Sequence, residues 1–118
     1  MKFMLMCCGE EKKFADMPKT EVDTIMEETS TYCEALHKNG TLITAEALEP
    51  VDMAATVRVR SGKLSTTDGP FAETKEQFGG FFLINARDLN EAIQVASKFP
   101  SARIGSMEVR PVRELQRQ

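Results

Sequence analysis

The sequence predicts an α+β fold, in a single domain that spans residues 1–118. Two segments repeat apolar residues at helical spacing, while the other apolar segments are short and bounded by glycine or proline. The predicted order is strand, helix, strand, hairpin, strand, helix, strand. Two helices among mostly antiparallel strands are typical of a sandwich with one helical layer and one sheet.

The first strand is predicted over residues 3–8 and the first helix over residues 20–38, joined by a polar connection. Thr20 and Asp23 have the spacing of a capping box. The glycine of Asn39-Gly40 ends the helix, because glycine readily adopts the left-handed conformation. The apolar side of this helix is predicted to comprise Val22, Ile25, Met26, Thr29, Cys33 and Leu36.

The second half of the chain is predicted to hold most of the sheet. Ser61-Gly62 is a hairpin turn signal. Asp88 is predicted to cap the second helix, with Glu91 in the reciprocal position, and Pro100 closes that helix. Five strands are predicted here, over residues 41–48, 54–60, 63–67, 79–86 and 103–112. The whole pattern predicts a ferredoxin-like βαββαβ-type sandwich.

Two of the strands indicate that the chain assembles with itself. Residues 3–8 (FMLMCC) and 79–84 (GGFFLI) are apolar on both alternating faces, whereas a sheet covered on one side alternates apolar and polar residues. The second face therefore needs a cover. The simplest cover is the same face of another copy, which predicts a homodimer. The alternative is that the connection over residues 9–20 folds beneath the sheet.

Composition argues against several classes of protein. A net charge of -3, with 15 basic and 18 acidic residues well mixed, offers no electrostatic footprint for nucleic acid. No apolar run is long enough for a membrane helix, and the apolar start is too short for a secretion signal, so a cytoplasmic location is expected. Three cysteines, one histidine and no C-x-x-C pattern predict neither a disulfide framework nor a metal site. No cofactor is predicted.

The segment TTDGPFAETKEQFGG, residues 66–80, is the strongest candidate for a functional site. Proton transfer by Asp68 would be favoured if an apolar wall such as Phe71 disfavoured its charged form, and Lys75 would steady a ligand anion. The competing interpretation is structural: Asp-Gly-Pro is a turn signal that ends one strand before the next begins. Both interpretations stay open on the residues alone.

Two other places carry charge in an informative pattern. Arg58 and Arg60 alternate with valines, so both arginines share one strand face; Arg58 would bind an anion if that face lined a dimer interior, and would only add solubility on an edge. His37 is predicted to be a surface imidazole near the negative end of the first helix.

Residues 68–100, from DGPF through GGFFLI to KFP, closely resemble the signature of the DGPF-type YCII-related proteins of bacteria. The resemblance implies a ferredoxin-like subunit that pairs into a dimeric α+β barrel, with ligands in the barrel or its end clefts. Related proteins are thought to use a histidine–aspartate pair, and one is a lyase-type dehydrochlorinase. Their histidine lies early in the first helix, where this chain has none, so only Asp68 keeps a candidate role.

Two functions are compatible with these observations. The first is a metal-independent small-molecule enzyme of the lyase or acid–base type, with Asp68 as its catalytic residue and Arg58, Phe71 and Lys75 around the ligand. The second is a non-catalytic ligand-binding or regulatory module; the family resemblance implies a connection to an extracytoplasmic-function sigma factor. A closed pocket with a converging acid–base pair would favour the first.

Overall fold

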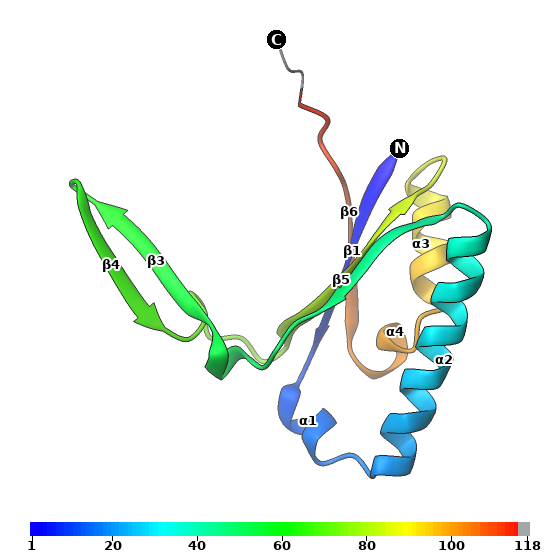
Figure 1. The fold of residues 1–118 in the computed structure, drawn as a ribbon, viewed down its shortest axis with the longest axis horizontal. Helices are drawn as coiled ribbons and strands as arrows, with labels where there is room; N and C mark the ends of the chain where they lie inside the picture. Colours follow the sequence, from blue (N-terminus) through cyan, green and yellow to red (C-terminus); the bar gives the residue numbers. More distant parts are fainter. Residues whose placement is uncertain (116–118) are drawn as a thin grey trace.

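The computed structural model describes residues 1–115, which form a two-layer body and a projecting arm (Figure 1). The strands are β1 (Lys2–Gly9), β2 (Leu42–Ala47), β3 (Ala55–Arg60), β4 (Lys63–Asp68), β5 (Gln77–Asn85) and β6 (Ser106–Pro111). The helices are α1 (Glu11–Ala15), α2 (Lys19–Lys38), α3 (Leu89–Ser97) and α4 (Ser101–Ile104), with a 3₁₀ turn, η1 (Val51–Met53).

The body contains a four-stranded sheet in the order β2-β5-β1-β6, with antiparallel neighbours throughout. The helices α2 and α3 lie on one side of this sheet (Figure 1). Two βαβ-like halves are thus interleaved, with the first and third strands of the body at the centre. The predicted ferredoxin-like α+β fold is confirmed.

The core lies between the central strands and the two long helices. Phe3 and Leu5 of β1 pair with Ile84 and Phe82 of β5, and all four side chains are buried. The ring of Phe82 stacks on that of Phe99, with centroids 4.0 Å apart. Burying side chains of this size contributes roughly 1.5–3 kcal/mol each. Leu36, Ala86, Ala92 and Ala96 complete the cluster.

Within the described part of the chain, no layer covers the opposite side of the sheet. Met4 pairs with Leu83, and Met6 pairs with Phe81; these residues alternate with the buried ones, so their side chains point away from the helices. All four are only half-buried. The connection over residues 9–20 does not fold beneath them: its helix α1 lies at one end of the body, beside the start of α2 (Figure 1). That alternative was wrong.

The arm is the hairpin of β3 and β4, which forms a separate two-stranded sheet. Ser61 and Gly62 have φ values of 51° and 74°, as a tight two-residue hairpin turn requires. Arg58 pairs with Ser65 and Arg60 with Lys63, so the two arginines share a face. The predicted turn and the predicted placement of the arginines on one face are both confirmed.

Local signals located the end of α2 and the start of α3, but they misplaced the start of α2 and the start of the last strand. Asp88 caps α3 by accepting a 2.9 Å hydrogen bond from the backbone N–H of Glu91, and Gly40 ends α2 with a φ of 80°. The helix α2, however, begins at Lys19 after Pro18, so Thr20 lies inside it and caps nothing. The last strand begins at Ser106 rather than at residue 103, because residues 101–104 form α4.

Candidate functional site

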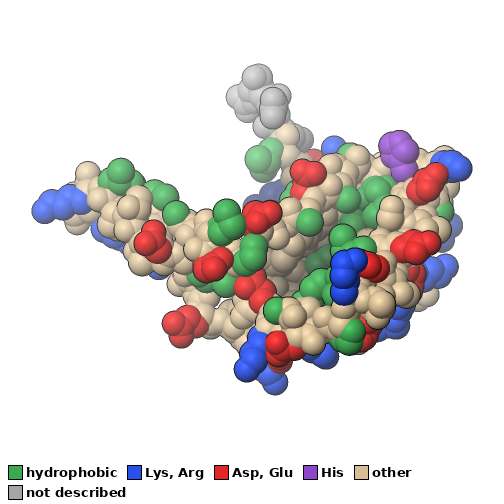
Figure 2. Space-filling model, turned by 60° about the horizontal axis from the view of Figure 1, so that its bottom comes forward, with side chains coloured by type: hydrophobic (Ala, Val, Ile, Leu, Met, Phe, Trp, Pro, Cys, Tyr) green, Lys and Arg blue, Asp and Glu red, His purple; other side chains and the backbone are tan. Residues whose placement is uncertain are grey.

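A pocket of about 630 Å³ lies at the end of the body where α1 is packed. It is open to solvent on one side and is lined by the end of β1, by α1, by the start of α2, by α4 and by the connection that follows β2. Figure 2 shows a hollow on this side of the molecule, with hydrophobic side chains inside and charged ones around it. Its wall is mainly apolar and includes Phe14, Met17, Met26, Leu48, Pro50 and Ile104.

The floor of the pocket is built from backbone that lies unusually close together. A Cβ atom placed on Gly105 would overlap the carbonyl oxygen of Cys8 and lie 3.2 Å from the Cα of Gly9. Only glycine therefore allows the end of α4 to approach β1 this closely. Gly79 also lines the pocket, but a Cβ atom there would meet nothing within 4 Å.

One side of the pocket is held by a small polar network. The backbone N–H of Glu11 donates a 3.0 Å hydrogen bond to Oε1 of Gln77, and the backbone N–H of Val51 donates a 3.0 Å bond to Oε2 of Glu11. Gln77 in turn donates from Nε2 to the carbonyl oxygen of Thr74, at 2.6 Å. The network joins α1 to η1 and to the segment before β5, three parts of the chain that are far apart in sequence.

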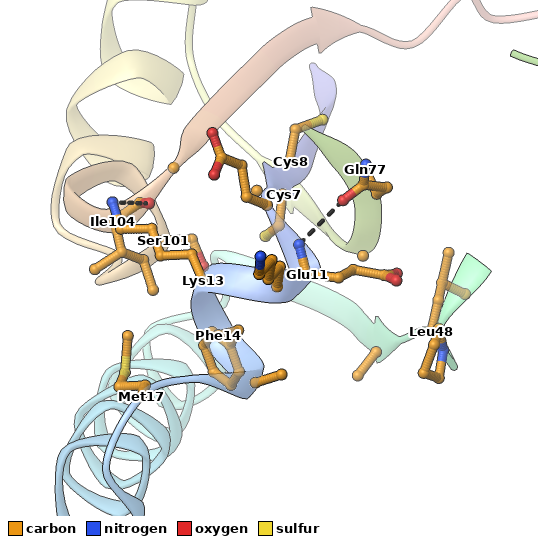
Figure 3. A pocket seen from close by; sticks show the side chains of 18 of the residues that line it. Cys7, Cys8, Glu11, Lys13, Phe14, Met17, Leu48, Gln77, Ser101 and Ile104 are labelled. Carbon is orange, nitrogen blue, oxygen red and sulfur yellow. Dashed lines mark hydrogen bonds between the residues drawn. The ribbon is translucent and has the colours of Figure 1, made fainter. Parts of the chain in front are cut away.

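A second contact crosses the pocket. Lys13 of α1 reaches the carbonyl oxygen of Ile104 with its Nζ, at 3.5 Å (Figure 3). Lys12, the preceding residue of α1, also lines the pocket. A ligand with an anionic or carbonyl group could take the place of the Ile104 oxygen, because an ammonium group has three donors.

Cys7 supplies a thiol to the pocket. Its Sγ lies 3.5 Å from the sulfur of Met107. Burial raises the pKa of the Cys7 thiol, and the Ser101 hydroxyl only partly opposes this effect. Burial also raises the pKa of the Cys8 and Cys33 thiols. Because the thiolate is the reactive form, these cysteines are neutral and weakly nucleophilic at neutral pH.

A β-bulge lies between Cys7 and Cys8, where the register with β5 shifts. The two sulfur atoms nevertheless point away from each other (Figure 3), as expected for adjacent strand residues, so they form no dithiol. Within residues 1–115, no three His, Cys, Asp or Glu side chains gather closely enough to hold a metal ion. What the site offers chemically is an apolar wall, two lysines (Lys12 and Lys13), two carboxylates (Glu10 and Glu11) and the neutral thiols of Cys7 and Cys8.

The predicted site residues lie elsewhere. Asp68 is the last residue of β4 and is exposed at the root of the arm. Phe71 follows it and is 81% exposed. Arg58 is half-buried on one face of the arm. The exposed Lys75 forms an ion pair with Glu10, with 3.6 Å between its Nζ and the Oε1 of Glu10. Since Glu10 lines the pocket, Lys75 contacts the pocket lining.

The turn after Asp68 has the predicted backbone. Gly69 has a φ of 93°; its N–H donates to the Ala54 carbonyl at 2.7 Å, and its own carbonyl accepts a 2.8 Å bond from the Thr56 hydroxyl. These bonds close the root of the arm. These hydrogen bonds support the structural interpretation of the turn. The catalytic role of Asp68 stays a prediction.

Sequence reasoning missed the residues that line the pocket. Phe14 and Met17 were assigned to a polar connection, although two large apolar residues in a charged stretch were a usable signal. Met26 was predicted to face the core, but it is 58% exposed and lines the pocket. Ile104 was assigned to a strand and lies in α4. His37 is exposed at the end of α2, as predicted.

Among the helices of residues 1–115, none combines the length and the apolar character needed to cross a membrane. A model of the YCII-related domain matches residues 1–116. An uncharacterized protein of Rhizobium meliloti (strain 1021) is 36% identical over 114 residues, which cover 95% of this chain and 92% of that protein. The resemblance found in the sequence is confirmed: the chain belongs to the YCII-related family.

Proposed function

We propose that this protein binds a small, largely apolar molecule in the pocket beside α1 and acts as a homodimer. The observation that supports ligand binding is the pocket itself. Its volume of about 630 Å³ lies within the range of small-molecule sites, which are typically apolar with a few placed polar groups. An aromatic ring would fit the apolar wall. A carboxylate or phenolate on that ring would be matched by Lys13 at the edge.

The uncovered face of the sheet supports the homodimer. Met4, Met6, Phe81 and Leu83 place four large apolar side chains on one side of the two central strands. Contiguous apolar surface of this kind marks an interaction site in soluble proteins. A second copy presents the same face, so two copies can cover each other about a two-fold axis.

Ligand binding is favoured over catalysis because, among the described residues, neither glutamate of the pocket lining forms an ion pair with Lys12 or Lys13. Its thiols are neutral, as their burial requires. The carboxylate of Glu11 already accepts a backbone hydrogen bond from Val51, and that of Glu10 pairs with the exposed Lys75.

Acid–base chemistry by Asp68 is the second candidate. It is favoured by one observation: Asp68 lies at the root of the arm, and the arm extends on the side of the sheet that the helices leave open (Figure 1). A second copy seated on that side would enclose Asp68 together with Phe71. Proton transfer by Asp68 would then take place at the interface of the two copies.

One screen separates the two candidates. The protein is tested by thermal shift against aromatic acids and chlorinated phenols, beside Phe14→Asp and the matched control Phe71→Asp, which makes the same change on an exposed aromatic outside the pocket. A compound at a hundred times its dissociation constant stabilises by roughly 2.7 kcal/mol. We expect Phe14→Asp to lose at least tenfold in affinity and Phe71→Asp to bind normally.

The reverse pattern would overturn the proposal. Loss of binding in Phe71→Asp and in Asp68→Asn, with Phe14→Asp unaffected, would move the site to the root of the arm. The homodimer is tested separately by size-exclusion chromatography with light scattering. A monomer at micromolar concentration would overturn that part of the proposal and leave the pocket standing.

A further inference from the structure

The arm, residues 55–68, makes the chain more extended than its length requires. The radius of gyration is 16.4 Å, whereas a compact chain of this length has about 13 Å. Figure 1 shows the two strands of the arm extending away from the body, and no helix or third strand of residues 1–115 lies against them. An isolated two-stranded hairpin is only marginally stable in water, so this arm needs a second surface.

The two faces of the arm differ in chemistry. Val57, Val59 and Leu64 share one face and are 61%, 58% and 69% exposed. Val59 and Leu64 are direct cross-strand partners, so their side chains form one continuous apolar row. Arg58, Arg60 and Lys63 belong to the other face. The arm is therefore an amphipathic ribbon whose apolar side is left exposed within one chain.

The position of the arm connects this row to the uncovered face of the sheet. The long helices lie on one side of the sheet, and the arm extends on the other (Figure 1). A body seated on Met4, Met6, Phe81 and Leu83 would therefore also lie within reach of the arm. We infer that the arm clasps a second copy of this chain, with Val57, Val59 and Leu64 packed on the partner's body.

Charge favours a second copy as the occupant. The arm carries Arg58, Arg60, Lys63 and Asp68, a net charge of +2. The whole chain has -3, so the rest of the chain has -3 minus +2, or -5. A basic arm of one copy and an acidic body of the other attract each other, and in a two-fold dimer the attraction occurs twice.

The area of exposed apolar surface also indicates that the arm takes part in the interface. A stable interface takes roughly 800 Å² from each partner. Four half-buried side chains on the sheet expose far less than that, whereas the three apolar residues of the arm are more than half exposed. The clasp rests on the proposed homodimer. It adds that the arm contributes to the dimer interface, and this can be disproved while the homodimer stands.

The test compares two hairpin variants by sedimentation over a dilution series. Val57→Thr/Val59→Thr/Leu64→Thr removes the apolar row while keeping residues that favour strands, so the hairpin can still form. We expect its dimer dissociation constant to rise at least tenfold. The control Ser65→Thr/Thr67→Ser changes the other face of the same hairpin. Its dimer dissociation constant should stay within twofold of that of the unaltered protein.

Hydrogen exchange provides the second readout and needs no substitution. In the clasped dimer the amides of β3 and β4 are protected, and this protection falls on dilution while that of β1 and β5 persists. A dimer whose arm exchanges freely, with the triple variant as tight as the unaltered protein, would overturn the clasp and leave the homodimer standing. A monomeric protein would overturn both the clasp and the homodimer. Both would also be overturned if the amides of the arm became protected only after another protein was added.

Discussion

The backbone N–H of Glu11 lies 3.0 Å from Oε1 of Gln77, and this hydrogen bond joins the first residue of α1 to the first residue of β5. The two residues are 66 positions apart in sequence. Through the further bond from Gln77 to Thr74, the wall of the pocket is attached to the segment that carries the DGPF signature. The segment therefore supports the pocket and contributes Gln77 and Gly79 to its lining.

Replacing Gln77 with Ala should weaken this attachment. The change leaves the Glu11 N–H and the Thr74 carbonyl without their partner, and a lost hydrogen bond at a partly buried site costs about 1–2 kcal/mol. Urea unfolding measures the loss. The control is Gln94→Ala on the exposed side of α3, expected within about 0.5 kcal/mol of the unaltered protein. Equal losses in the two variants would contradict a specific role for Gln77.

Replacing Gly105 with Ala should distort the floor of the pocket. The added methyl group would overlap the Cys8 carbonyl oxygen, which is backbone and cannot rotate away. We expect a loss of about 1–3 kcal/mol in the free energy of unfolding, as for other overpacked sites. Gly79→Ala is the matched control, since its methyl group meets nothing within 4 Å. A thermal melt that shows both variants equally stable would disprove this account of the floor.

The ion pair between Arg103 and Glu28 should make stability depend on pH. Two hydrogen bonds of 2.9 and 3.0 Å join α4 to α2, and the Arg103 guanidinium lowers the pKa of Glu28 below its ordinary 4.5. A carboxylate whose pKa is lowered in the folded state stabilises the protein at pH values above the ordinary pKa. This stability is lost as the pH falls through the pKa of the folded state. Glu28→Gln should therefore melt below the unaltered protein at pH 7, and the difference should shrink toward pH 3.

Both partners of that ion pair are exposed, so 1 M salt should also reduce the difference. The control is Glu27→Gln, which removes a neighbouring exposed carboxylate. A difference in melting temperature that stays constant from pH 7 to pH 3 would show that packing of residue 28, and not its charge, holds α4 to α2.

The Cys7 thiol should react slowly with alkylating agents. Burial raises its pKa, so the thiolate fraction at pH 7.5 is below that of a free thiol. In a protein whose other cysteines are changed, Cys8→Ser/Cys33→Ser, iodoacetamide should label Cys7 more slowly than glutathione. The rate should still be rising at pH 9, because the thiolate is the reactive form and burial raises the pKa of Cys7 above its ordinary 9.0. A rate that levels off below pH 8 would contradict a raised pKa.

Labelling of Cys7 also reports on the pocket. A compound that binds beside α1 should slow the reaction further, because Cys7 lines the same space. A compound that stabilises the protein but leaves the labelling rate unchanged binds at another place, and the root of the arm at Asp68 would be the next site to examine.

The elements that could be predicted are those with strong local signals. The hairpin turn at Ser61 and Gly62 and the cap at Asp88 depend on backbone preferences within four residues. The helices α1 and α4 were missed because five and four residues are too short to show a repeating apolar side. The start of α2 was misplaced because Thr20 offered a cap, while Pro18 ended the preceding segment two residues earlier.

The sequence by itself determined the order of the strands and long helices, and it showed that two central strands are apolar on both faces. It did so because the period of apolar residues is a local property of the chain. The pocket and the arm were decided only by the tertiary structure. The pocket requires Cys7, Phe14, Met26, Leu48 and Ile104 to meet in one place, and no spacing in the sequence encodes a contact among five separate segments. The arm was predicted as a hairpin, but its projection beyond the sheet depends on where its root leaves the body.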